Sequence, residues 1–382
     1  MDNGLTITYS IADQSLARSK SVGILNVSLN LLRHLALMPE VSRLTVFGNS
    51  SFDPRMLPGG THGTWEGHDE ALRSPLHRML WDQAGVYRAG RRSGNDWLLI
   101  AKGFASFVRK PDNLLACILY DGMHDYYREH YPRGFPRFEM FYFLNSLKAT
   151  IRHADVIFTI SDFTTSEVLR IARKYGLQPP PVVTMGIGFS DEDLLVKQLH
   201  RPAARENSIV VLASRWPHKR TDLAIRYMEA WQARTGFTGP VHWVGTLPAG
   251  VPLPPRRNWS FKPRLSYEDY GRLLSRARAL VYFSEYEGFG MPPIEALLAG
   301  ASPVYSDIPV TREVMAGAGC AFLNASAESF GAALDRALEV PAGALREWLY
   351  GLLERHSWYN VCAKVIEGMT QVQSAKKGPA RP

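Results

Sequence analysis

The chain has 382 residues, of which 46% are hydrophobic and 21% are charged, so it is long enough for two globular domains. No apolar run approaches the roughly 20 residues of a membrane-spanning helix, which argues against an integral membrane protein. The net charge of +8 leaves nucleic acid, an anionic membrane and an anionic substrate open as partners.

The cysteines and the N-terminus indicate a cytoplasmic protein. Cys117, Cys320 and Cys362 are odd in number and scattered, which favours neither a disulfide framework nor a zinc site. The chain begins Met-Asp-Asn-Gly and lacks a charged-then-apolar signal peptide. We therefore expect the cytoplasm, and we expect the polar tail over 373–382 to be disordered.

The first half of the chain predicts a doubly wound sheet. Apolar runs predict strands over 5–9 and 43–47, joined by a helix that begins near Gly23. Further strands are predicted over 97–100, 114–120, 155–160 and 182–186, whereas residues 49–95, which contain several prolines and glycines, are expected to be irregular. Sheets of this kind bind ligands beyond the carboxyl ends of their strands.

A His-Asp pair follows the predicted strand 114–120. A lone histidine is more often structural, but His124 stands where a ligand is expected and could hydrogen-bond a sugar hydroxyl or shield positive charge at a reacting carbon. Asp125 could then orient His124. The spacing of His124, Asp125 and His130 fits no standard metal site, so no metal is expected.

A proline-rich break at 178–181 precedes the last predicted strand of the first half, and after a linker the first strand of the second half is predicted over 208–214. The loop after this strand carries Arg215, Lys219 and Arg220 and leads into a helix from Thr221. A charged loop is usually solvated. Cations at the carboxyl end of a strand, beside a helix N-terminus, could instead neutralise a diphosphate.

A glycine-rich turn follows the predicted strand 279–283. Gly288 and Gly290 lack side chains that would keep a phosphate from the backbone, and Pro292 opens a helix that ends at Gly300. Glu287 and Glu295 would repel a phosphate, so we expect them to accept hydrogen bonds from sugar hydroxyls. The alternative is an ordinary strand–turn–helix with solvated glutamates.

The pattern Glu-x7-Glu around Gly-Phe-Gly-Met-Pro resembles the signature of the retaining glycosyltransferases of family 4. This resemblance implies the α/β GT-B fold, with two Rossmann-like doubly wound domains facing across a cleft. It also implies an N-terminal acceptor-binding domain over 1–190 and a nucleotide-sugar-binding domain over 191–356. The C-terminal helix, near 357–372, would return to the first domain.

The same resemblance implies roles for individual residues. Lys219 and Arg215 (or Arg220 in its place) would contact the diphosphate, Glu287 the donor sugar, Glu295 the ribose, and His124 the reacting side of the sugar. The remaining implied contacts to the donor are Gly23, Arg264, Leu265, Gly288, Phe289, Gly290, Met291 and Pro292.

These features predict a hexosyltransferase that acts without a cofactor or metal. The donor would be a nucleotide-diphosphate sugar such as GDP-mannose or a dTDP- or GDP-deoxyhexose. The acceptor would be a glycan or lipid-linked glycan in cell-surface polysaccharide, lipopolysaccharide or exopolysaccharide assembly. The basic charge would suit peripheral contact with an anionic membrane at the inner face of the plasma membrane.

Two other functions stay open. An enzyme of the same fold could decorate a small natural product. A protein of another class could bind nucleotides or nucleic acid without catalysis, although no nucleic-acid-binding motif with interleaved aromatic residues is present, so no nucleic-acid partner is expected.

Overall fold

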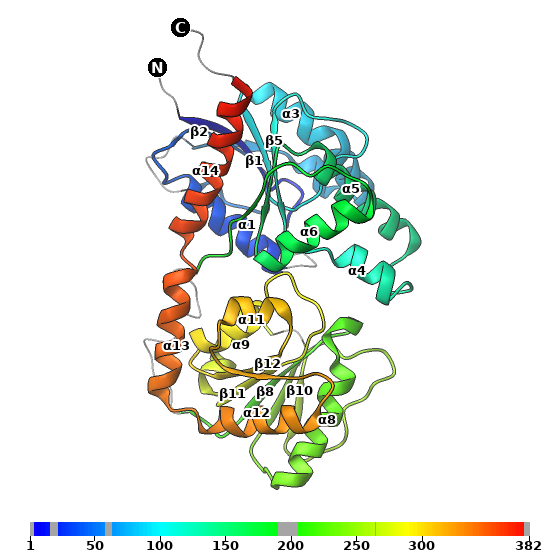
Figure 1. Ribbon diagram of the computed structural model, residues 1–382, viewed down its shortest axis with the longest axis vertical. Coiled ribbons are helices and arrows are strands. Elements are labelled where there is room, and N and C mark those ends of the chain that lie inside the picture. The colour runs from blue at the N-terminus through cyan, green and yellow to red at the C-terminus, as the bar shows by residue number, and fades with distance from the viewer. Residues whose placement is uncertain (1–3, 16–21, 58–62, 190–204, 264, 378–382) are drawn as a thin grey trace. The chain divides into compact units, whose positions relative to one another are not determined.

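The structure is a computed structural model that describes residues 4–15, 22–57, 63–189, 205–263 and 265–377. Contacts between Cα atoms divide the chain into two units. The first comprises residues 1–188 and 356–382, and the second comprises residues 189–355. Each unit is built on one parallel sheet covered by helices (Figure 1).

The sheet of the first unit has seven strands in the order β3-β2-β1-β4-β5-β6-β7, and its described neighbouring pairs are parallel. The strands are β1 (Leu5–Ser10), β2 (Val41–Gly48), β3 (Gly63–Gly67), β4 (Trp97–Ile100), β5 (Leu114–Leu119), β6 (Val156–Thr159) and β7 (Val182–Thr184). None of the five residues of β3 is buried, as suits an edge strand, whereas β4 and β6 are buried throughout.

The helices of the first unit connect these strands and cover the sheet. They are α1 (Val22–Leu35), α2 (Pro75–Leu80), α3 (Val86–Ser93), α4 (Met123–His130), α5 (Arg137–His153), α6 (Asp162–Lys174) and α14 (Trp358–Lys377). A π-helical turn over Trp81–Gly85 joins α2 to α3, and short 3-10 turns occupy Pro54–Met56 and Asp69–Leu72. The described part of residues 49–95 is therefore more regular than its composition predicted.

The second unit has a six-stranded sheet in the order β10-β9-β8-β11-β12-β13. Its strands are β8 (Ile209–Ala213), β9 (Val241–Gly245), β10 (Trp259–Lys262), β11 (Ala279–Tyr282), β12 (Ser302–Ser306) and β13 (Cys320–Phe322). Its helices are α8 (Thr221–Thr235), α9 (Tyr267–Arg276), α10 (Met291–Leu298), α11 (Pro309–Met315), α12 (Ala327–Glu339) and α13 (Ala342–Arg355), with a 3-10 turn over Pro217–Lys219.

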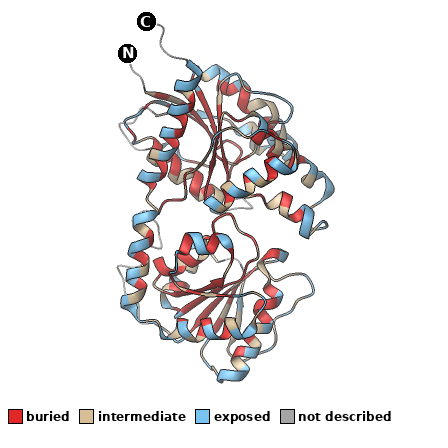
Figure 2. Cartoon of the chain, viewed as in Figure 1, coloured by how far each residue is buried: buried red, intermediate tan, exposed pale blue. Residues whose placement is uncertain are grey.

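Burial follows these layers. The central strands of both sheets are buried, and the surrounding helices alternate buried and exposed residues along their length (Figure 2). The core of the second unit gathers aromatic rings from three elements, with Phe283 packed against Phe322 and Phe330 at ring-centroid distances of 4.6 and 5.2 Å. Such packing of apolar strand faces under amphipathic helices is what the alternating sequence pattern predicts.

Each sheet has a point where the chain reverses the direction in which it adds strands. In the first sheet this switch point lies between β1 and β4, because β2 and β3 extend one side and β5 to β7 the other. In the second sheet it lies between β8 and β11 for the same reason. Ligands of doubly wound sheets bind at the carboxyl ends of the strands beside such a point.

The C-terminal helix α14 belongs to the first unit, as predicted, and it contacts α1, β6 and β7. The ring of Trp358 stacks on His34 at a centroid distance of 5.7 Å, and a Cβ at Gly188 would lie 2.5 Å from the Trp358 nitrogen. The helix continues to Lys377, past the start of the tail expected from residue 373. It is held there because Gln373 accepts a hydrogen bond from Trp97 Nε1 at 2.8 Å and Lys376 pairs with Asp155.

Candidate functional site

The turn between β11 and α10 depends on the backbone conformation of Gly290. Gly290 has φ +83° and immediately precedes α10, a conformation that a residue with a Cβ would adopt only under strain. Pro292 and Pro293 occupy the first turn of α10, and Gly300 has φ +79° just past the end of the helix. Gly288, Phe289 and Gly290 are buried, so the Phe289 ring packs into the core.

Lys219 and Glu287 form an ion pair at the switch point of the second sheet. Lys219 follows β8 and Glu287 follows β11, the two strands that meet there. The Lys219 Nζ also donates to the Tyr282 hydroxyl at 2.7 Å, and the Ser284 hydroxyl donates to Glu287 Oε1 at 2.6 Å. The structure therefore brings together a predicted phosphate-binding cation and a predicted sugar-binding carboxylate.

Glu287 is ionised in this cluster. Burial by itself would raise the pKa of the carboxyl, but the charge of Lys219 and hydrogen bonds from Lys219 and Ser284 lower that pKa below its usual value. The side chain of Glu287 is 12% exposed and that of Lys219 is 22% exposed. A charged acceptor is thus held in a largely dry setting with one edge open.

Tyr282 and Tyr270 lie near the two glutamates of the motif, and sequence reasoning did not select either residue. Burial, then the charge of Glu287, then that of Glu295 raise the pKa of Tyr282 well above 10, and burial and Glu295 do the same for Tyr270. Both hydroxyls are therefore protonated and can donate hydrogen bonds. A polar tip at the end of an otherwise aliphatic strand was the signal that could have identified Tyr282.

The two arginines of the cationic loop differ in their surroundings. Arg220 has φ +44° and pairs with both Asp222 and Glu285, and its hydrogen bond with Asp222 is the main cause of its raised pKa. Arg215 is exposed, and its guanidinium lies 5.2 Å from the centroid of the Trp216 ring. Arg220 is thus already neutralised within the loop, whereas Arg215 is the more available of the two for an incoming anion.

His124 lies at the N-terminal end of α4 among aromatic rings. Its ring stacks on Phe143 at a centroid distance of 4.5 Å, and the rings of Phe135 and Phe104 lie at 5.0 and 5.8 Å. Burial lowers its pKa to about 4. His124 is therefore neutral at pH 7 and can donate or accept a hydrogen bond without adding a positive charge.

Asp125 does not orient His124, contrary to the sequence interpretation. Neighbouring residues on a helix point in different directions, and the Asp125 side chain turns toward α6. It accepts hydrogen bonds from Arg170 at 2.9 Å, Lys174 at 2.7 Å and Tyr175 at 2.7 Å. Asp125 thus fixes α4 to α6 and affects His124 only by positioning the helix that carries it.

A second charged cluster lies at the switch point of the first sheet, and sequence reasoning missed it. Lys102, which follows β4, lies 2.7 Å from Asp13 Oδ2, which follows β1, and also pairs with Asp82 of the π-helical turn. Burial by itself would raise the pKa of Asp13, but the charge of Lys102 and a hydrogen bond from it lower that pKa below its usual value. For Asp82 the effect of burial is the larger one, and the pKa is raised. The Tyr142 hydroxyl donates to Asp82 Oδ2 at 3.2 Å.

This cluster is bordered by buried acceptor atoms without protein partners. Among the described residues, Ser10 Oγ, Asp13 Oδ1 and Gln14 Oε1 take part in no hydrogen bond with protein. Such atoms in a buried setting call for a donor, because an unsatisfied buried polar group costs about 1–3 kcal/mol. These atoms at the carboxyl end of β1 are candidates for accepting hydrogen bonds from the hydroxyl groups of a ligand.

The remaining predicted residues are placed as follows. Gly23 is exposed near the start of α1, and no atom lies within 4 Å of a Cβ built on it. Leu265 is half-buried just before α9, and Arg264 lies outside the described residues. Among the parts of the chain that the structure describes, no three His, Cys, Asp or Glu side chains are grouped to hold a metal ion.

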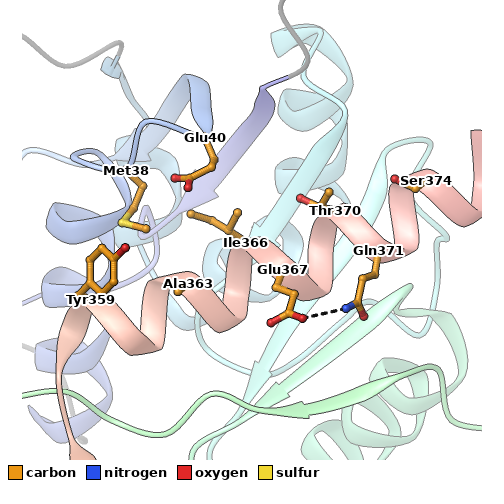
Figure 3. Close-up of a pocket in the computed structure, with 9 residues that line it drawn as sticks. All are labelled: Met38, Glu40, Tyr359, Ala363, Ile366, Glu367, Thr370, Gln371 and Ser374. Atoms are coloured by element: carbon orange, nitrogen blue, oxygen red, sulfur yellow. Dashed lines mark hydrogen bonds between the residues drawn. The ribbon is translucent and has the colours of Figure 1, made fainter. Parts of the chain in front are cut away.

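A cavity of about 580 Å³ lies elsewhere, between α14 and the turn that joins α1 to β2 (Figure 3). Met38 and Glu40 line it from the turn, and Tyr359, Ile366 and Glu367 line it from α14. None of the predicted site residues borders this cavity. It is a surface groove along α14, separate from both charged clusters.

Two doubly wound units in one chain are the architecture of the GT-B fold. The fold is similar to that of HepE from Anabaena, solved in complex with UDP-glucose, with a TM-score of 0.63 and 16% identity over 96% of this chain and all of that one. Residues 253–349 match the family model described as glycosyl transferases group 1. The matched stretch contains the motif from Glu287 to Glu295, in agreement with the resemblance to the family 4 glycosyltransferases.

Two relatives are O-antigen chain mannosyltransferases. RfbU of Salmonella typhimurium is 28% identical over 197 residues, which cover 50% of this chain and 53% of RfbU, so the matched part spans about half of that relative. O-antigen chain mannosyltransferase B of Escherichia coli is 25% identical over 328 residues, covering 78% of this chain and 82% of the relative. Within the described residues, no helix combines the length and apolar character needed to cross a membrane.

Proposed function

We propose that this protein transfers a hexosyl unit, with retention at the anomeric carbon, from a nucleotide-diphosphate sugar to an acceptor hydroxyl. The observation that carries the proposal is the Lys219–Glu287–Tyr282 cluster beside the Gly288–Gly290 turn. It places a cation, a carboxylate and a helix N-terminus together at the carboxyl ends of β8 and β11. A nucleotide sugar requires this combination, because its diphosphate and its hydroxyls need groups of opposite character.

The leaving diphosphate is assigned to Lys219, Arg215 and the N–H groups of Gly290 and Met291. As the bond from the anomeric carbon to the phosphate oxygen breaks, negative charge grows on that oxygen, and fixed positive groups stabilise it. Lys219 is preorganised for this role, since Tyr282 and Glu287 hold its ammonium in place. The released phosphate oxygen takes the acceptor proton on the same face of the sugar, so no protein nucleophile is required.

The donor sugar is assigned to Glu287 and His124, and the ribose to Glu295. Glu287 is ionised and can accept from two hydroxyls. Neutral His124 can donate to or accept from a sugar hydroxyl without placing a charge beside a positive oxocarbenium-like carbon. Gly23, Arg264, Leu265, Phe289 and Pro292 are proposed as further donor contacts.

The acceptor is assigned to the cluster of Asp13, Lys102 and Asp82. Its unpaired buried acceptors suit the hydroxyls of a sugar, and the ionised Asp13 carboxylate can receive two of them. The mannosyltransferase relatives support GDP-mannose as donor and a growing glycan as acceptor, in cell-surface polysaccharide assembly. A lipid-linked acceptor would bring the enzyme to the cytoplasmic face of the membrane.

A panel of nucleotide sugars tests this function. GDP-mannose, GDP- and dTDP-deoxyhexoses and UDP-glucose are added in turn, and the melting temperature and slow donor hydrolysis are measured, since a ligand stabilises the fold that binds it. We expect one donor to raise the melting temperature in the wild type and to do so less in Glu295→Ala. NMR of the product anomer should show retention. An inverted product, or no stabilisation or hydrolysis with any donor, contradicts the proposal.

The same assay separates the two alternatives. A small soluble aglycone that accepts sugar as well as a lipid-linked glycan would favour an enzyme of natural-product decoration. Salt-sensitive DNA binding without any donor hydrolysis would favour the non-catalytic nucleic-acid-binding protein. The charged cluster around Glu287 counts against nucleic-acid binding, because a carboxylate repels the phosphates of DNA, but it does not distinguish between the two kinds of glycosyltransferase.

A further inference from the structure

Exposed large hydrophobic side chains are concentrated on three segments of the first unit. Such residues are normal when scattered singly, whereas a contiguous group marks an interaction surface. Phe138 and Phe141 of α5 are 65% and 59% exposed, and Val108 is 73% exposed. Six of the thirteen exposed large hydrophobic residues among the described part of the chain belong to these segments: Leu76, Leu80, Phe107, Val108, Phe138 and Phe141.

Contacts join the three segments into one surface. The Phe107 and Phe141 rings are 6.3 Å apart between centroids, and the Phe107 N–H donates to Gln83 Oε1 at 3.1 Å. Leu76 and Leu80 are one helical turn apart, and Gln83 follows three residues later in the continuous helix, so these residues share a face. Gln83 also donates to the Tyr142 hydroxyl at 3.3 Å, next to Phe141. We call this group of six the apolar face.

Each part of the apolar face has exposed basic neighbours. Arg109 and Lys110 directly follow Phe107 and Val108, and Arg137 directly precedes Phe138. In the same segments, Glu139 is half-buried, and the exposed Asp112 pairs with Arg91. The exposed basic residues of the three segments are His77, Arg78, Arg109, Lys110, Arg133 and Arg137.

We propose that the apolar face is a docking surface for an anionic phospholipid bilayer. Apolar and aromatic side chains that enter the headgroup region, ringed by cations that meet lipid phosphates, are the two components of interfacial binding. The charge argues against a second copy of this chain as the occupant. A two-fold dimer would place the face against itself and bring two sets of like charges together.

The position of the apolar face suits the proposed function. Phe143, two residues after Phe141 on α5, stacks on His124 at 4.5 Å between ring centroids. One helix therefore carries both the membrane-facing side chains and the packing of a proposed sugar-binding residue. A lipid-linked acceptor would reach the enzyme from this side. The delivery of a lipid-linked acceptor rests on the proposed function, whereas the binding of the apolar face to a bilayer does not.

Vesicle co-sedimentation tests the proposal with the full chain. The protein is mixed with vesicles of phosphatidylcholine alone or with about one third phosphatidylglycerol, and the bound fraction is measured. We expect binding to the anionic vesicles only. The pair Phe138→Ser with Phe141→Ser should weaken it about tenfold or more, and Arg109→Ser with Lys110→Ser likewise, since each basic residue near the surface contributes severalfold.

Matched controls keep the result unambiguous. Leu323→Ser with Tyr350→Ser changes two exposed apolar residues of the second unit, and Arg226→Ser with Lys364→Ser changes exposed cations elsewhere. Both pairs should bind as the wild type does. Binding that is absent, equal on neutral vesicles, or unchanged in the face variants overturns the proposal. So does a dimer in light scattering that the Phe138→Ser, Phe141→Ser pair dissociates.

Donor hydrolysis without vesicles is measured in parallel. Normal hydrolysis together with lost vesicle binding in the face variants separates docking from catalysis. If no donor is hydrolysed while vesicles still bind, the proposed function fails and the docking surface stands. If vesicles do not bind while hydrolysis proceeds, the docking surface alone fails.

Discussion

The two sheets carry charged clusters at matching places but with the charges exchanged. In the second unit the strand before the switch point leads to Lys219 and the strand after it to Glu287. In the first unit the equivalent strands lead to Asp13 and Lys102. The strand order thus determines where polar side chains come together, and the residue types at those positions determine what the cluster can bind. One cluster suits a diphosphate with a sugar, and the other suits hydroxyls alone.

The clusters also differ in how their charges balance. Lys219 faces one carboxylate, supported by the neutral donors Tyr282 and Ser284. Lys102 faces two carboxylates, Asp13 and Asp82, with Arg78 Nε 3.5 Å from Asp13. Removing the lysine should therefore damage folding more in the first unit and chemistry more in the second.

The largest effect is expected from Lys102→Met. The substitution leaves two buried carboxylates without their shared cation, which should lower the free energy of unfolding by about 3–5 kcal/mol. Urea unfolding measures the loss, with Lys364→Met as an exposed control. Adding Asp82→Asn to Lys102→Met should restore part of the stability. A loss no greater than that of the control would mean that the cluster is solvated.

Lys219→Ala should act on the reaction. Losing a charged contact to the leaving phosphate should lower turnover roughly 10²-fold or more, or about 3 kcal/mol of transition-state stabilisation. Turnover with saturating donor is compared with that of Arg226→Ala, which removes an exposed cation from α8. Near-normal turnover in Lys219→Ala would remove the phosphate role from this residue.

A smaller effect is expected from His218, which should make the stability of the protein depend on pH. Burial lowers the pKa of this histidine to about 4, whereas the unfolded chain has a value near 6.5. Below pH 6.5 the unfolded state binds a proton that the folded state does not bind. The free energy of unfolding therefore decreases as the pH is lowered from about 6.5 to about 4. At pH 5 the loss is roughly 2 kcal/mol.

The comparison of wild type with His218→Asn isolates this contribution. Melting temperatures are measured from pH 7.5 to 4.5, and the slope should be shallower in the variant. His124 contributes in the same direction from the first unit, since its pKa is also about 4. Identical slopes in wild type and variant would show that His218 is not neutral in the fold.

The parts of the site that the sequence predicted are those built from neighbouring residues. The turn from Glu287 to Pro292 is local, so spacing and glycine chemistry sufficed to place its helix and its ends. Lys219 was found because a strand and a helix bracket it closely. The pairing of Lys219 with Glu287, and the contribution of Tyr282, depend on which strands are neighbours and could not be obtained from spacing.

The parts of the site that the sequence did not predict depend on contacts between residues that are far apart in the chain. Asp13, Asp82 and Lys102 are far apart in sequence and meet only because β1 and β4 are adjacent. The segment 49–95 contains glycines and prolines that hid β3, α2 and α3, although Pro75 in fact opens α2. Asp125 was assigned from its neighbour in sequence, whereas its true partners are on α6.

Helix α14 has a consequence for how the chain matures on the ribosome. The first unit is completed by residues that are synthesised after the second unit, because Trp97 donates a hydrogen bond to Gln373, 276 positions later in the sequence. The second unit is one continuous stretch and has all its strands before α14 emerges. The usual order, in which the N-terminal domain folds first during synthesis, is therefore reversed at the final step, and truncated chains should fail in their opening half.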